Sequence, residues 1–292
     1  MFKGSIVALV TPFKNGAVDE KAFHDLVEWH ISEGTHGLVP VGTTGESPTL
    51  THAEHMRVTE LCIEAAGGRV PVIAGTGSNA TAEAIEFTQH AKTAGADAAL
   101  VVTPYYNKPT QEGLYAHFKA IHDAAEIPIL IYNIPGRTAL NMEPPLIAEL
   151  AAIPGVVALK QANDDLSQLA QVMDACELAI YAGNDDMLMP VLEMGGTGVI
   201  SVASHLVGSA MQQMVALAAA GDLDGAREID ASLATLWSGL FEVTNPILIK
   251  AALAMCGMIP TDHLRLPLVP ATAGERERLA ALLGDHGITG GS

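Results

Sequence analysis

Cysteine is one of the residue types that this chain has little of. Its 292 residues include three cysteines, Cys62, Cys176 and Cys256, which lie far apart and form no C-x-x-C pair. This pattern fits neither a disulfide framework nor a thiolate metal site. We therefore expect the cysteines to be small buried side chains in a protein of a reducing, cytoplasmic compartment.

Positive charge is also scarce. Lysine and arginine together number 15 against 33 aspartates and glutamates, which gives a formal net charge of −18. Such a chain offers no cationic surface that could release counterions from a nucleic acid or lie on an anionic lipid surface. We expect neither nucleic acids nor membranes among its partners.

Long hydrophobic runs are absent as well. Glycine and proline interrupt every candidate, as Pro154 and Gly155 do, so no run approaches the roughly 20 residues that a membrane-spanning helix needs. The apolar stretch near the N-terminus is too short for a secretory signal and is soon followed by Pro12. This stretch is better explained as a first strand.

Sequence motifs for common cofactors and nucleophiles are missing. The chain has no G-x-x-x-x-G-K-[ST], and residues 75–80 lack the third glycine of the dinucleotide fingerprint. It has no H-E-x-x-H either, with His52 and His55 as the closest pair of histidines, and Thr49 replaces the last glycine of the nucleophile-elbow pattern. We expect no organic cofactor, no metal ion and no serine hydrolysis.

Eight short apolar runs, rich in β-branched residues, alternate along the chain with longer segments of helical spacing. Apolar residues make up 49% of the chain, which is enough for a full core. Runs that are apolar on both faces are typical of parallel strands covered by helices. The predicted strands are 6–13, 37–42, 70–77, 98–105, 127–134, 156–160, 178–182 and 198–203.

Eight strand–helix units in series, without a linker between them, favour an α/β fold of the closed (β/α)8 TIM barrel type over an open doubly wound sheet. After about residue 206 the strands stop and further helices are predicted. We therefore expect a barrel over residues 1–206 and a C-terminal helical region over 207–292 that packs on it. The predicted helices include 20–33, 53–66, 81–94, 111–125, 145–152, 209–220, 223–243 and 245–256.

Two of the eight lysines follow apolar runs. Lys250 lies in a segment that continues as a helix, so we expect its long side chain to reach the surface. Lys160 ends the sixth predicted strand on the same face as Val156 and Ala158, and in a barrel that face points inward. A buried ammonium loses its proton more easily, and the neutral amine can attack a ketone to form a Schiff base. A buried ion pair is the alternative explanation for Lys160.

Other strand ends supply polar groups to the same mouth of the barrel. Residues 42–47 combine glycines, which permit close approach, with the hydroxyls of Thr43 and Thr44 and successive N–H groups that can hold a carboxylate. Tyr132 shares the inward face of the fifth strand, so its phenol can move protons there. Arg137, just beyond that strand, can bind a second carboxylate bidentately.

Five segments of the chain stand out together: 42–47 (GTTGES), 103–107 (TPYYN), 132–138 (YNIPGRT), 159–160 (LK) and 198–202 (GVISV). In order and spacing they resemble the dihydrodipicolinate synthase (4-hydroxy-tetrahydrodipicolinate synthase) family, and the likeness covers essentially the whole chain. The wider class of pyruvate-dependent class I aldolases, which includes N-acetylneuraminate lyase, shares the lysine and the Tyr-Asn-Ile-Pro segment. Thr44 and Arg137 resemble the synthase branch.

The resemblance implies a lyase that condenses pyruvate with L-aspartate 4-semialdehyde in the diaminopimelate and lysine pathway, without metal or cofactor. It implies that Lys160 forms the Schiff base and that Tyr132, Thr43 and Tyr106 form a proton relay. Tyr106 would come from a neighbouring subunit, so the protein would be a homodimer or homotetramer.

The resemblance also assigns the groups that bind substrates and regulator. The loop with Thr43 and Thr44 would hold the pyruvate carboxylate and Arg137 the semialdehyde carboxylate, while Gly183 and Ile200 would line the pocket through backbone groups. Lysine, the end product, would inhibit from the dimer cleft, where a carboxylate beside an aromatic ring can hold an ammonium group. The residues that match the lysine site are Ser47, His52, His55, Asn79, Glu83 and Tyr105.

The chain departs from the family pattern at three notable positions. Gln161 stands where an acidic residue is common, Asn184 where aspartate is usual, and Pro48 where a smaller residue is usual. Two other functions stay open: another pyruvate-dependent aldolase, such as N-acetylneuraminate lyase, and a barrel that binds a carboxylate metabolite without catalysis. Arg137 argues against a neutral polyol aldehyde as substrate, since such a molecule has no carboxylate to pair with it.

Overall fold

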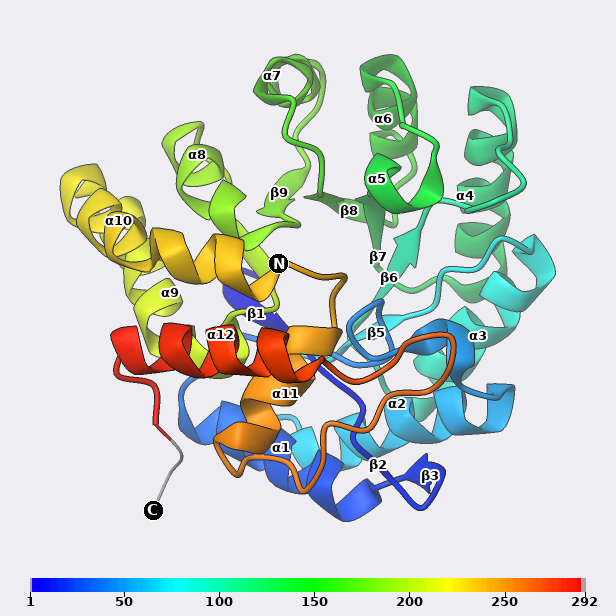
Figure 1. Ribbon diagram of the computed structural model, residues 1–292. Helices are drawn as coiled ribbons and strands as arrows, with labels where there is room; N and C mark the ends of the chain where they lie inside the picture. The colour runs from blue at the N-terminus through cyan, green and yellow to red at the C-terminus, as the bar shows by residue number, and fades with distance from the viewer. Residues whose placement is uncertain (1, 290–292) are drawn as a thin grey trace.

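Eight parallel strands form a closed ring in the computed structural model, which describes residues 2–289. Around the ring the strands follow the order β4-β1-β10-β9-β8-β7-β6-β5, and a parallel bridge between Leu38 and Val72 joins the two ends. Helices surround the ring (Figure 1). The predicted (β/α)8 barrel is confirmed. The barrel strands are β1 (Gly4–Ala8), β4 (Leu38–Val39), β5 (Ile73–Gly75), β6 (Ala98–Val102), β7 (Ile129–Asn133), β8 (Val156–Gln161), β9 (Ala179–Ala182) and β10 (Gly198–Ser201).

The helices between the strands begin and end where local residues satisfy their free backbone groups. At the start of α2 (His52–Ala66), the side chains of Thr51 and Glu54 each accept a hydrogen bond from the other's backbone N–H. The helix ends at Gly67, whose φ of 55° suits glycine. The other helices up to β10 are α1 (Glu20–Ser32), α3 (Thr81–Ala94), α4 (Gln111–Ala125), α5 (Pro135–Thr138), α6 (Pro144–Ala151), α7 (Leu166–Ala175) and α8 (Leu188–Glu193).

Two hydrophobic cores lie on the two sides of the strands. The inner core fills the barrel with inward side chains such as Ile6, Leu130 and Tyr132. The larger outer core lies between the strands and the surrounding helices. Alternation along each strand sorts the side chains between the two cores.

One predicted inward position is wrong. Val156 belongs to the outer core, while Ala158 belongs to the inner one. Two consecutive residues of β7 pair with Val156 and Ala158, so Val157 is an extra residue in the ladder. Such a bulge shifts the alternation of side chains by one position. Lys160 lies beyond the bulge and two residues after Ala158, so it keeps the inward direction.

A short antiparallel hairpin follows β1 and is not among the predicted elements. It consists of β2 (Phe13–Lys14) and β3 (Ala17–Val18), joined by Asn15 and Gly16. Both turn residues have positive φ, 52° and 83°, as the turns favoured in two-residue hairpins require. The Asn-Gly pair is the sequence signal that predicts such a turn.

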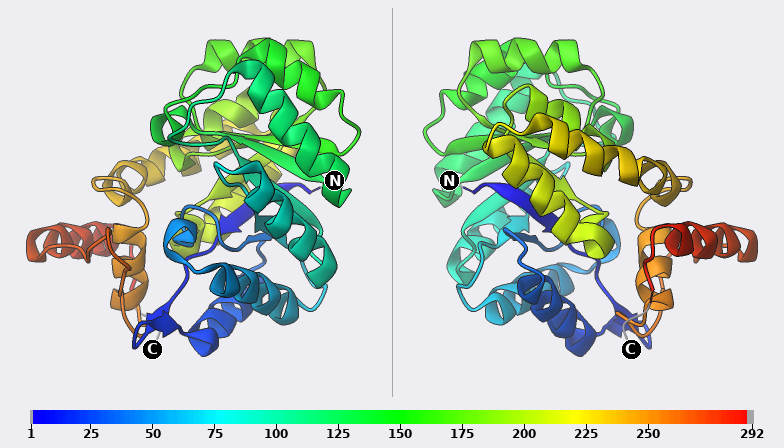
Figure 2. Two further views of the ribbon diagram at one scale, coloured as in Figure 1. Left: turned by 90° about the vertical axis from the view of Figure 1, so that its right-hand side faces the viewer. Right: turned by 90° about the vertical axis from the view of Figure 1, so that its left-hand side faces the viewer.

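The C-terminal helices form an extension on one side of the barrel, where Figure 2 shows the last two in orange and red. The predicted helices 209–220, 223–243 and 245–256 correspond to α9 (Ser204–Ala219), α10 (Leu223–Leu240) and α11 (Ile247–Met255). A further helix, α12 (Ala273–Asp285), was not predicted, although Thr272 and Glu275 form a capping box at its start. Within residues 2–289, no helix combines the length and hydropathy that crossing a membrane requires.

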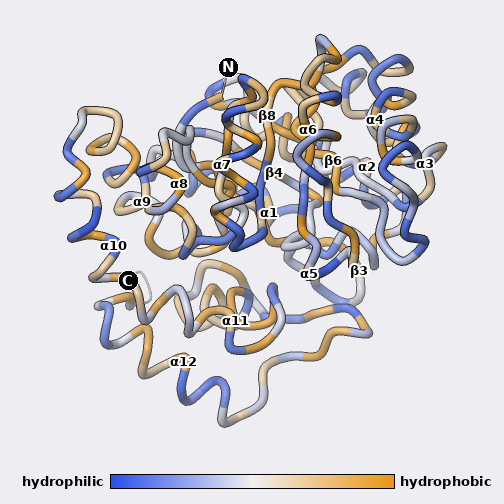
Figure 3. The backbone as a smooth tube through the Cα atoms, turned by 90° about the horizontal axis from the view of Figure 1, so that it is seen from above, coloured by the Kyte–Doolittle hydropathy of each residue, from blue (hydrophilic) through white to orange (hydrophobic). Residues whose placement is uncertain are grey.

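The expected division of the chain after residue 206 stays a prediction. That point lies inside α9, beside Val207, whose backbone departs from helical angles. Helix α9 packs against β1, as the eighth helix of a barrel does, whereas α11 and α12 pack against each other. In Figure 3, α11 is largely hydrophobic along its length, which fits its burial between the barrel and the other C-terminal helices.

Candidate active site

A cavity of about 410 Å³ opens at the end of the barrel where the carboxyl ends of the strands meet. This end carries the active site in characterised barrels of this type. The cavity wall brings together residues from the ends of β7 and β8 and from the segments that follow β4, β7 and β9. Six residues with a predicted role in the reaction line it: Thr43, Thr44, Tyr132, Arg137, Lys160 and Gly183.

Lys160 lies inside the barrel with only 5% of its surface exposed. Its Nζ is 4.4 Å from the centre of the Tyr132 ring and forms no ion pair with any residue of the described range 2–289. Burial lowers the pKa of Lys160 to about 8, and the negative charge of Asp185 partly opposes that shift. Part of the population therefore carries a neutral, nucleophilic amine near neutral pH.

Tyr132 provides the phenol beside this amine. Burial raises its pKa to about 12, so the phenol is protonated and can donate a proton. The Thr43 side chain near the phenol partly opposes this rise in pKa. Tyr106, by contrast, is 89% exposed and does not line the cavity of its own chain. The geometry within one chain thus joins Lys160, Tyr132 and Thr43, but not Tyr106.

Thr44 and Arg137 are held by the segment that precedes α11. The Nδ2 of Asn245 donates to Oγ1 of Thr44 at 2.9 Å, and the Nη2 of Arg137 donates to the carbonyl oxygen of Asn245 at 3.1 Å. Asn245 also lines the cavity. Sequence reasoning missed Asn245, because no local pattern places a residue 108 positions downstream of Arg137 against it.

Gly183 and Ile200 differ in their relation to the cavity. Gly183 lines it, and a Cβ at this position would lie 2.5 Å from the Cβ of Ala162, so a larger side chain does not fit. Ile200 is fully buried in the inner core and does not line the cavity. Val202, two residues further along, lines it instead, because the cavity lies above the layer of side chains that Ile200 fills.

Asp185 is a second residue that sequence reasoning missed. Its carboxylate is buried and accepts hydrogen bonds from the backbone N–H groups of Val202 and Ala203, at 3.3 and 2.8 Å. Burial raises its pKa, while these bonds and the charge of Lys160 oppose that rise. Asp185 thus ties the end of β9 to the end of β10 and supplies a negative charge near the amine.

A network of amide side chains lies behind Lys160 and Tyr132. Asn133 follows Tyr132, Gln161 follows Lys160, and the Nδ2 of Asn133 donates to the Oε1 of Gln161 at 3.1 Å. Asn141 accepts from Asn133 at 2.8 Å. Gln161, a departure from the family pattern, therefore keeps the acceptor oxygen that a carboxylate would supply, but its Nε2 is buried without a partner among the described residues.

The expectation that Lys250 reaches the surface is wrong. Its side chain is fully buried, and its Nζ lies 2.6 Å from Oε1 of Glu46 and 2.8 Å from the carbonyl oxygen of Thr11. Helix α11 lies beside the loop that follows β4, and the side that carries Lys250 faces that loop. Local helical spacing does not show which side of a helix the rest of the chain will cover.

The residues with a predicted role in lysine binding form two contacting groups. His52 Nε2 lies 2.7 Å from Oε1 of Glu83, and the Nδ2 of Asn79 donates to the carbonyl oxygen of Tyr105 at 3.2 Å. The hydroxyl of Ser78 also donates to Glu83, although the sequence did not single Ser78 out.

The other two members of the predicted lysine site lie apart from these bonds. The His55 ring is buried and stacks on the Phe87 ring, with 3.9 Å between the ring centres. Burial lowers the pKa of His55 to about 4. Ser47 lines the active-site cavity, as does Tyr105. Ser47 and Tyr105 therefore border both the cavity and the predicted regulatory site. No group of three or more histidine, cysteine, aspartate or glutamate side chains suited to a metal ion occurs among residues 2–289.

Comparison with known proteins adds a family and close relatives. The model of the dihydrodipicolinate synthetase family matches residues 1–286. The 4-hydroxy-tetrahydrodipicolinate synthase of Syntrophobacter fumaroxidans is 52% identical over 290 residues, which covers 99% of this chain and 100% of that protein.

Two solved structures share both the fold and much of the sequence. The chloride-inhibited dihydrodipicolinate synthase of Acinetobacter baumannii, complexed with pyruvate, is 46% identical with a TM-score of 0.96, covering 99% of this chain and 100% of that one. The DHDPS of Cyanidioschyzon merolae, with lysine bound, is 41% identical with a TM-score of 0.95, covering 98% and 99% of the two chains.

Proposed function

Because the chain belongs to the dihydrodipicolinate synthetase family, we propose that it condenses pyruvate with L-aspartate 4-semialdehyde to 4-hydroxy-tetrahydrodipicolinate, a step towards diaminopimelate and lysine. The observation that carries this proposal is Lys160. It is buried at the cavity, has no counter-ion in the described chain, and has a pKa of about 8. A lysine kept partly neutral beside a substrate-sized cavity suits Schiff-base chemistry.

The reaction begins when Lys160 Nζ attacks the carbonyl carbon of pyruvate and water leaves, which gives an iminium ion. Loss of a proton from the methyl carbon of pyruvate converts the iminium into an enamine. The enamine carbon then attacks the aldehyde of the semialdehyde, whose oxygen takes up a proton and becomes the hydroxyl. Finally, the amine of the semialdehyde attacks the iminium carbon, closes the ring and releases Lys160.

Tyr132 and Thr43 are the proposed carriers of these protons. The centre of the Tyr132 ring is 4.4 Å from Lys160 Nζ, and Thr43 lines the same cavity. Its high pKa keeps it protonated, so it can deliver a proton to the departing oxygen. Tyr106 would complete the relay from a second subunit, and its 89% exposure leaves it free to do so.

The carboxylates of the two substrates are assigned to separate groups. The Thr43–Thr44 loop would hold the carboxylate of pyruvate near Lys160, and Gly183 would line the pocket through its backbone groups. Arg137 would bind the carboxylate of the semialdehyde. Ile200, assigned by resemblance to the pocket wall, would act only as support from the layer below.

The experiment that tests the function is product formation from pyruvate with aspartate semialdehyde, run beside the same enzyme with pyruvate and N-acetylmannosamine. We expect turnover with the semialdehyde and none above background with the sugar. Turnover with the sugar alone would favour the lyase branch of the aldolases. Turnover with neither, together with no borohydride-trapped pyruvate on Lys160, would favour a barrel that only binds a carboxylate.

The variant Arg137→Ala tests the assignment of the second carboxylate. A charge-assisted pair contributes about 1.5–3 kcal/mol, so we expect KM for the semialdehyde to rise about ten- to hundredfold while KM for pyruvate changes much less. Steady-state kinetics with each substrate varied in turn measures this. A larger effect on pyruvate would show that Arg137 serves the other carboxylate.

We also propose that lysine inhibits the protein at the cluster of His52, Asn79, Glu83 and Tyr105, with Ser47 and His55 beside it. Burial and the negative charge of Glu83 raise the pKa of the Tyr105 phenol, and a carboxylate with an aromatic side chain suits an ammonium group. Lysine is bound in the related structure from Cyanidioschyzon merolae. In a coupled assay, inhibition that Glu83→Gln weakens is expected; no inhibition up to millimolar lysine would contradict the proposal.

Assembly and location are part of the same proposal. We infer a homodimer or homotetramer, because Tyr106 is needed for the relay and points away from its own cavity. The three cysteines are unpaired, as expected of a protein in the reducing cytoplasm. Sedimentation of the wild-type protein measures the assembly, and a monomer with full activity would remove Tyr106 from the mechanism.

A further inference from the structure

We propose that Lys250 is a positioning residue for pyruvate binding. Through its buried ion pair with Glu46 it holds the loop that carries Thr43 and Thr44, so the C-terminal helical region sets the geometry of the carboxylate site. This inference rests on the proposed function. It concerns an ion pair that takes no part in the reaction and lies behind the cavity wall.

The pair is fully buried and well connected. Neither the Lys250 nor the Glu46 side chain has any exposed surface, and Nζ lies 2.6 Å from Oε1. The ammonium also donates to the carbonyl oxygen of Thr11 at 2.8 Å and lies 4.4 Å from the centre of the Phe13 ring. Burial lowers the pKa of Lys250, and the carboxylate beside it opposes that shift.

Glu46 belongs to the same short loop as the two threonines. Its backbone has a φ of 57°, and its N–H donates to the carbonyl oxygen of Thr43 at 3.1 Å. Its second carboxylate oxygen accepts from the backbone N–H of Arg265 at 3.0 Å. The loop is therefore held in an uncommon conformation by groups outside it, which is how a strained turn persists in a folded protein.

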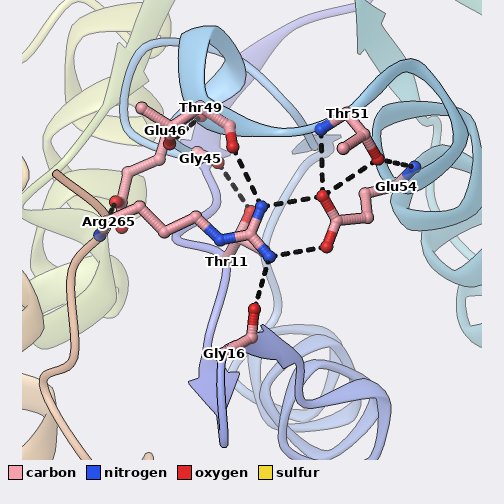
Figure 4. Close-up of polar contacts among 8 residues, drawn as sticks. All are labelled: Thr11, Gly16, Gly45, Glu46, Thr49, Thr51, Glu54 and Arg265. Carbon is pink, nitrogen blue, oxygen red and sulfur yellow. Dashed lines mark hydrogen bonds and ion pairs between the residues drawn. The ribbon is translucent and has the colours of Figure 1, made fainter.

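A second set of hydrogen bonds holds the same loop in place. The Thr11 hydroxyl donates to the carbonyl oxygen of Gly45 at 2.7 Å. The Arg265 guanidinium donates to the carbonyl oxygens of Thr49 and Gly16, both at 2.9 Å, and pairs with Glu54 (Figure 4). The segment between α11 and α12 thus contacts Glu46 and Thr49, while Thr11 holds Gly45.

The start of α11 also contacts the substrate-binding side chains directly. Asn245 donates to Thr44 and accepts from Arg137, while Lys250 lies on the first turns of the helix that follows. One helix and its leading segment therefore touch both predicted carboxylate sites. A shift of α11 would move the two sites together.

The energetics of a buried ion pair favour a geometric role. Two charges removed from water stabilise a fold no better than well-packed apolar residues of similar volume. They are directional, however, because both oxygens of Glu46 and at least two donors of Lys250 have defined partners. The pair therefore specifies where the loop lies more than it contributes to stability.

The test compares the wild-type protein with the double variant Glu46→Gln/Lys250→Met. The double variant removes both charges, so no uncompensated charge stays buried. Each protein is treated with borohydride and either pyruvate or acetone at high concentration, and the adduct at Lys160 is quantified by mass spectrometry. Acetone reacts with the amine but has no carboxylate for the loop to hold.

We expect the preference for pyruvate over acetone to fall about tenfold or more in the double variant, the loss of one well-placed charge-assisted contact. The amount of acetone trapped on Lys160 and the midpoint of thermal unfolding should stay close to the wild-type values. The control Arg227→Met breaks another C-terminal ion pair with a 2.6 Å contact, to Glu193 on the outside of the barrel, and should leave the preference unchanged.

Three results would overturn the inference. An unchanged preference would show that the ion pair does not position the loop. A double variant that fails to fold would show that the pair is required for the fold itself. Equal loss of trapping with both ketones would show general damage to the site. A wild-type protein without a pyruvate adduct at Lys160 would instead refute the proposed function and this inference with it.

Discussion

Lys160 and Lys250 are both buried at the same end of the barrel, yet their surroundings differ. Lys160 lies at the cavity beside Tyr132, with no ion pair in residues 2–289. Lys250 lies behind the cavity wall, 2.6 Å from Glu46. The difference lies in the partner, because burial lowers the pKa of both lysines.

One residue type can thus serve two purposes in the same protein. A lysine without a fixed partner keeps an amine that can become neutral and react. A lysine with a carboxylate partner stays charged and holds two chain segments together.

The largest effect is expected from Lys160→Ala. Removal of the nucleophile should lower kcat by at least about a thousandfold, since no other group in the cavity can form the Schiff base. Steady-state assays measure the loss, and borohydride trapping with pyruvate should label wild type but not the variant. A pyruvate label on Lys250 instead of Lys160 would show that Lys250 is the reactive lysine.

The same substitution at the two positions should affect stability in opposite ways. Lys250→Met leaves the Glu46 carboxylate buried without a partner, which should lower the free energy of unfolding by about 3–5 kcal/mol. Lys160→Met removes a buried ammonium that lacks an ion pair, so it should leave stability unchanged or raise it. Urea unfolding of both variants and the wild type at pH 7 measures these changes in the free energy of unfolding. Equal destabilisation would show that the partner is not what distinguishes the two lysines.

A third buried side chain, His205, has neither a substrate cavity nor a counter-ion beside it in the described part of the chain. Burial lowers the pKa of His205 to about 4, so the folded protein keeps it neutral while the unfolded chain takes up a proton below about 6.5. Its contribution to stability is complete above pH 6.5 and is lost as the pH falls towards 4.

The matched variant for this prediction is His205→Gln. Between pH 7 and pH 5 the wild type should lose about 2 kcal/mol more unfolding free energy than the variant. The control His24→Gln, at an exposed position, should behave as wild type. Identical losses in all three proteins would mean that His205 is protonated in the folded state.

The smallest effect concerns pH and the reactivity of Lys160. With a pKa of about 8, roughly a tenth of the amine is neutral at pH 7, and this fraction falls about tenfold for each further pH unit downward. The initial rate at which borohydride traps pyruvate on Lys160 should therefore rise about tenfold for each pH unit up to about pH 8 and level off above it. A rate that keeps rising to pH 10 would indicate an ordinary lysine.

Prediction from sequence succeeded where the signal is local and repeated. Eight apolar runs separated by helical segments sufficed for the barrel, and the Asn15-Gly16 pair and the Thr272–Glu275 box show that even unpredicted elements had local signals. The alternation of side chains along a strand placed Lys160 and Tyr132 on the inward face. It failed for Val156, because a bulge depends on the neighbouring strand.

Contacts between distant segments were beyond such reasoning. Asn245 against Thr44, Asp185 against the N–H groups after β10, and Lys250 against Glu46 join residues that share no periodic pattern. Lys250 is the clearest case. Helical spacing gives a residue's position around its own axis, but not what lies opposite.

The alternation of strands and helices, the inward lysine and the polar residues at the strand ends are predictable from the residues alone, because they follow from side-chain direction and hydrophobic spacing along the chain. The packing of distant segments sets which lysine has a counter-ion and which lies at the cavity. That choice depends on the elements that pack against each ammonium, since the desolvation that burial imposes is offset only by groups brought close through the fold.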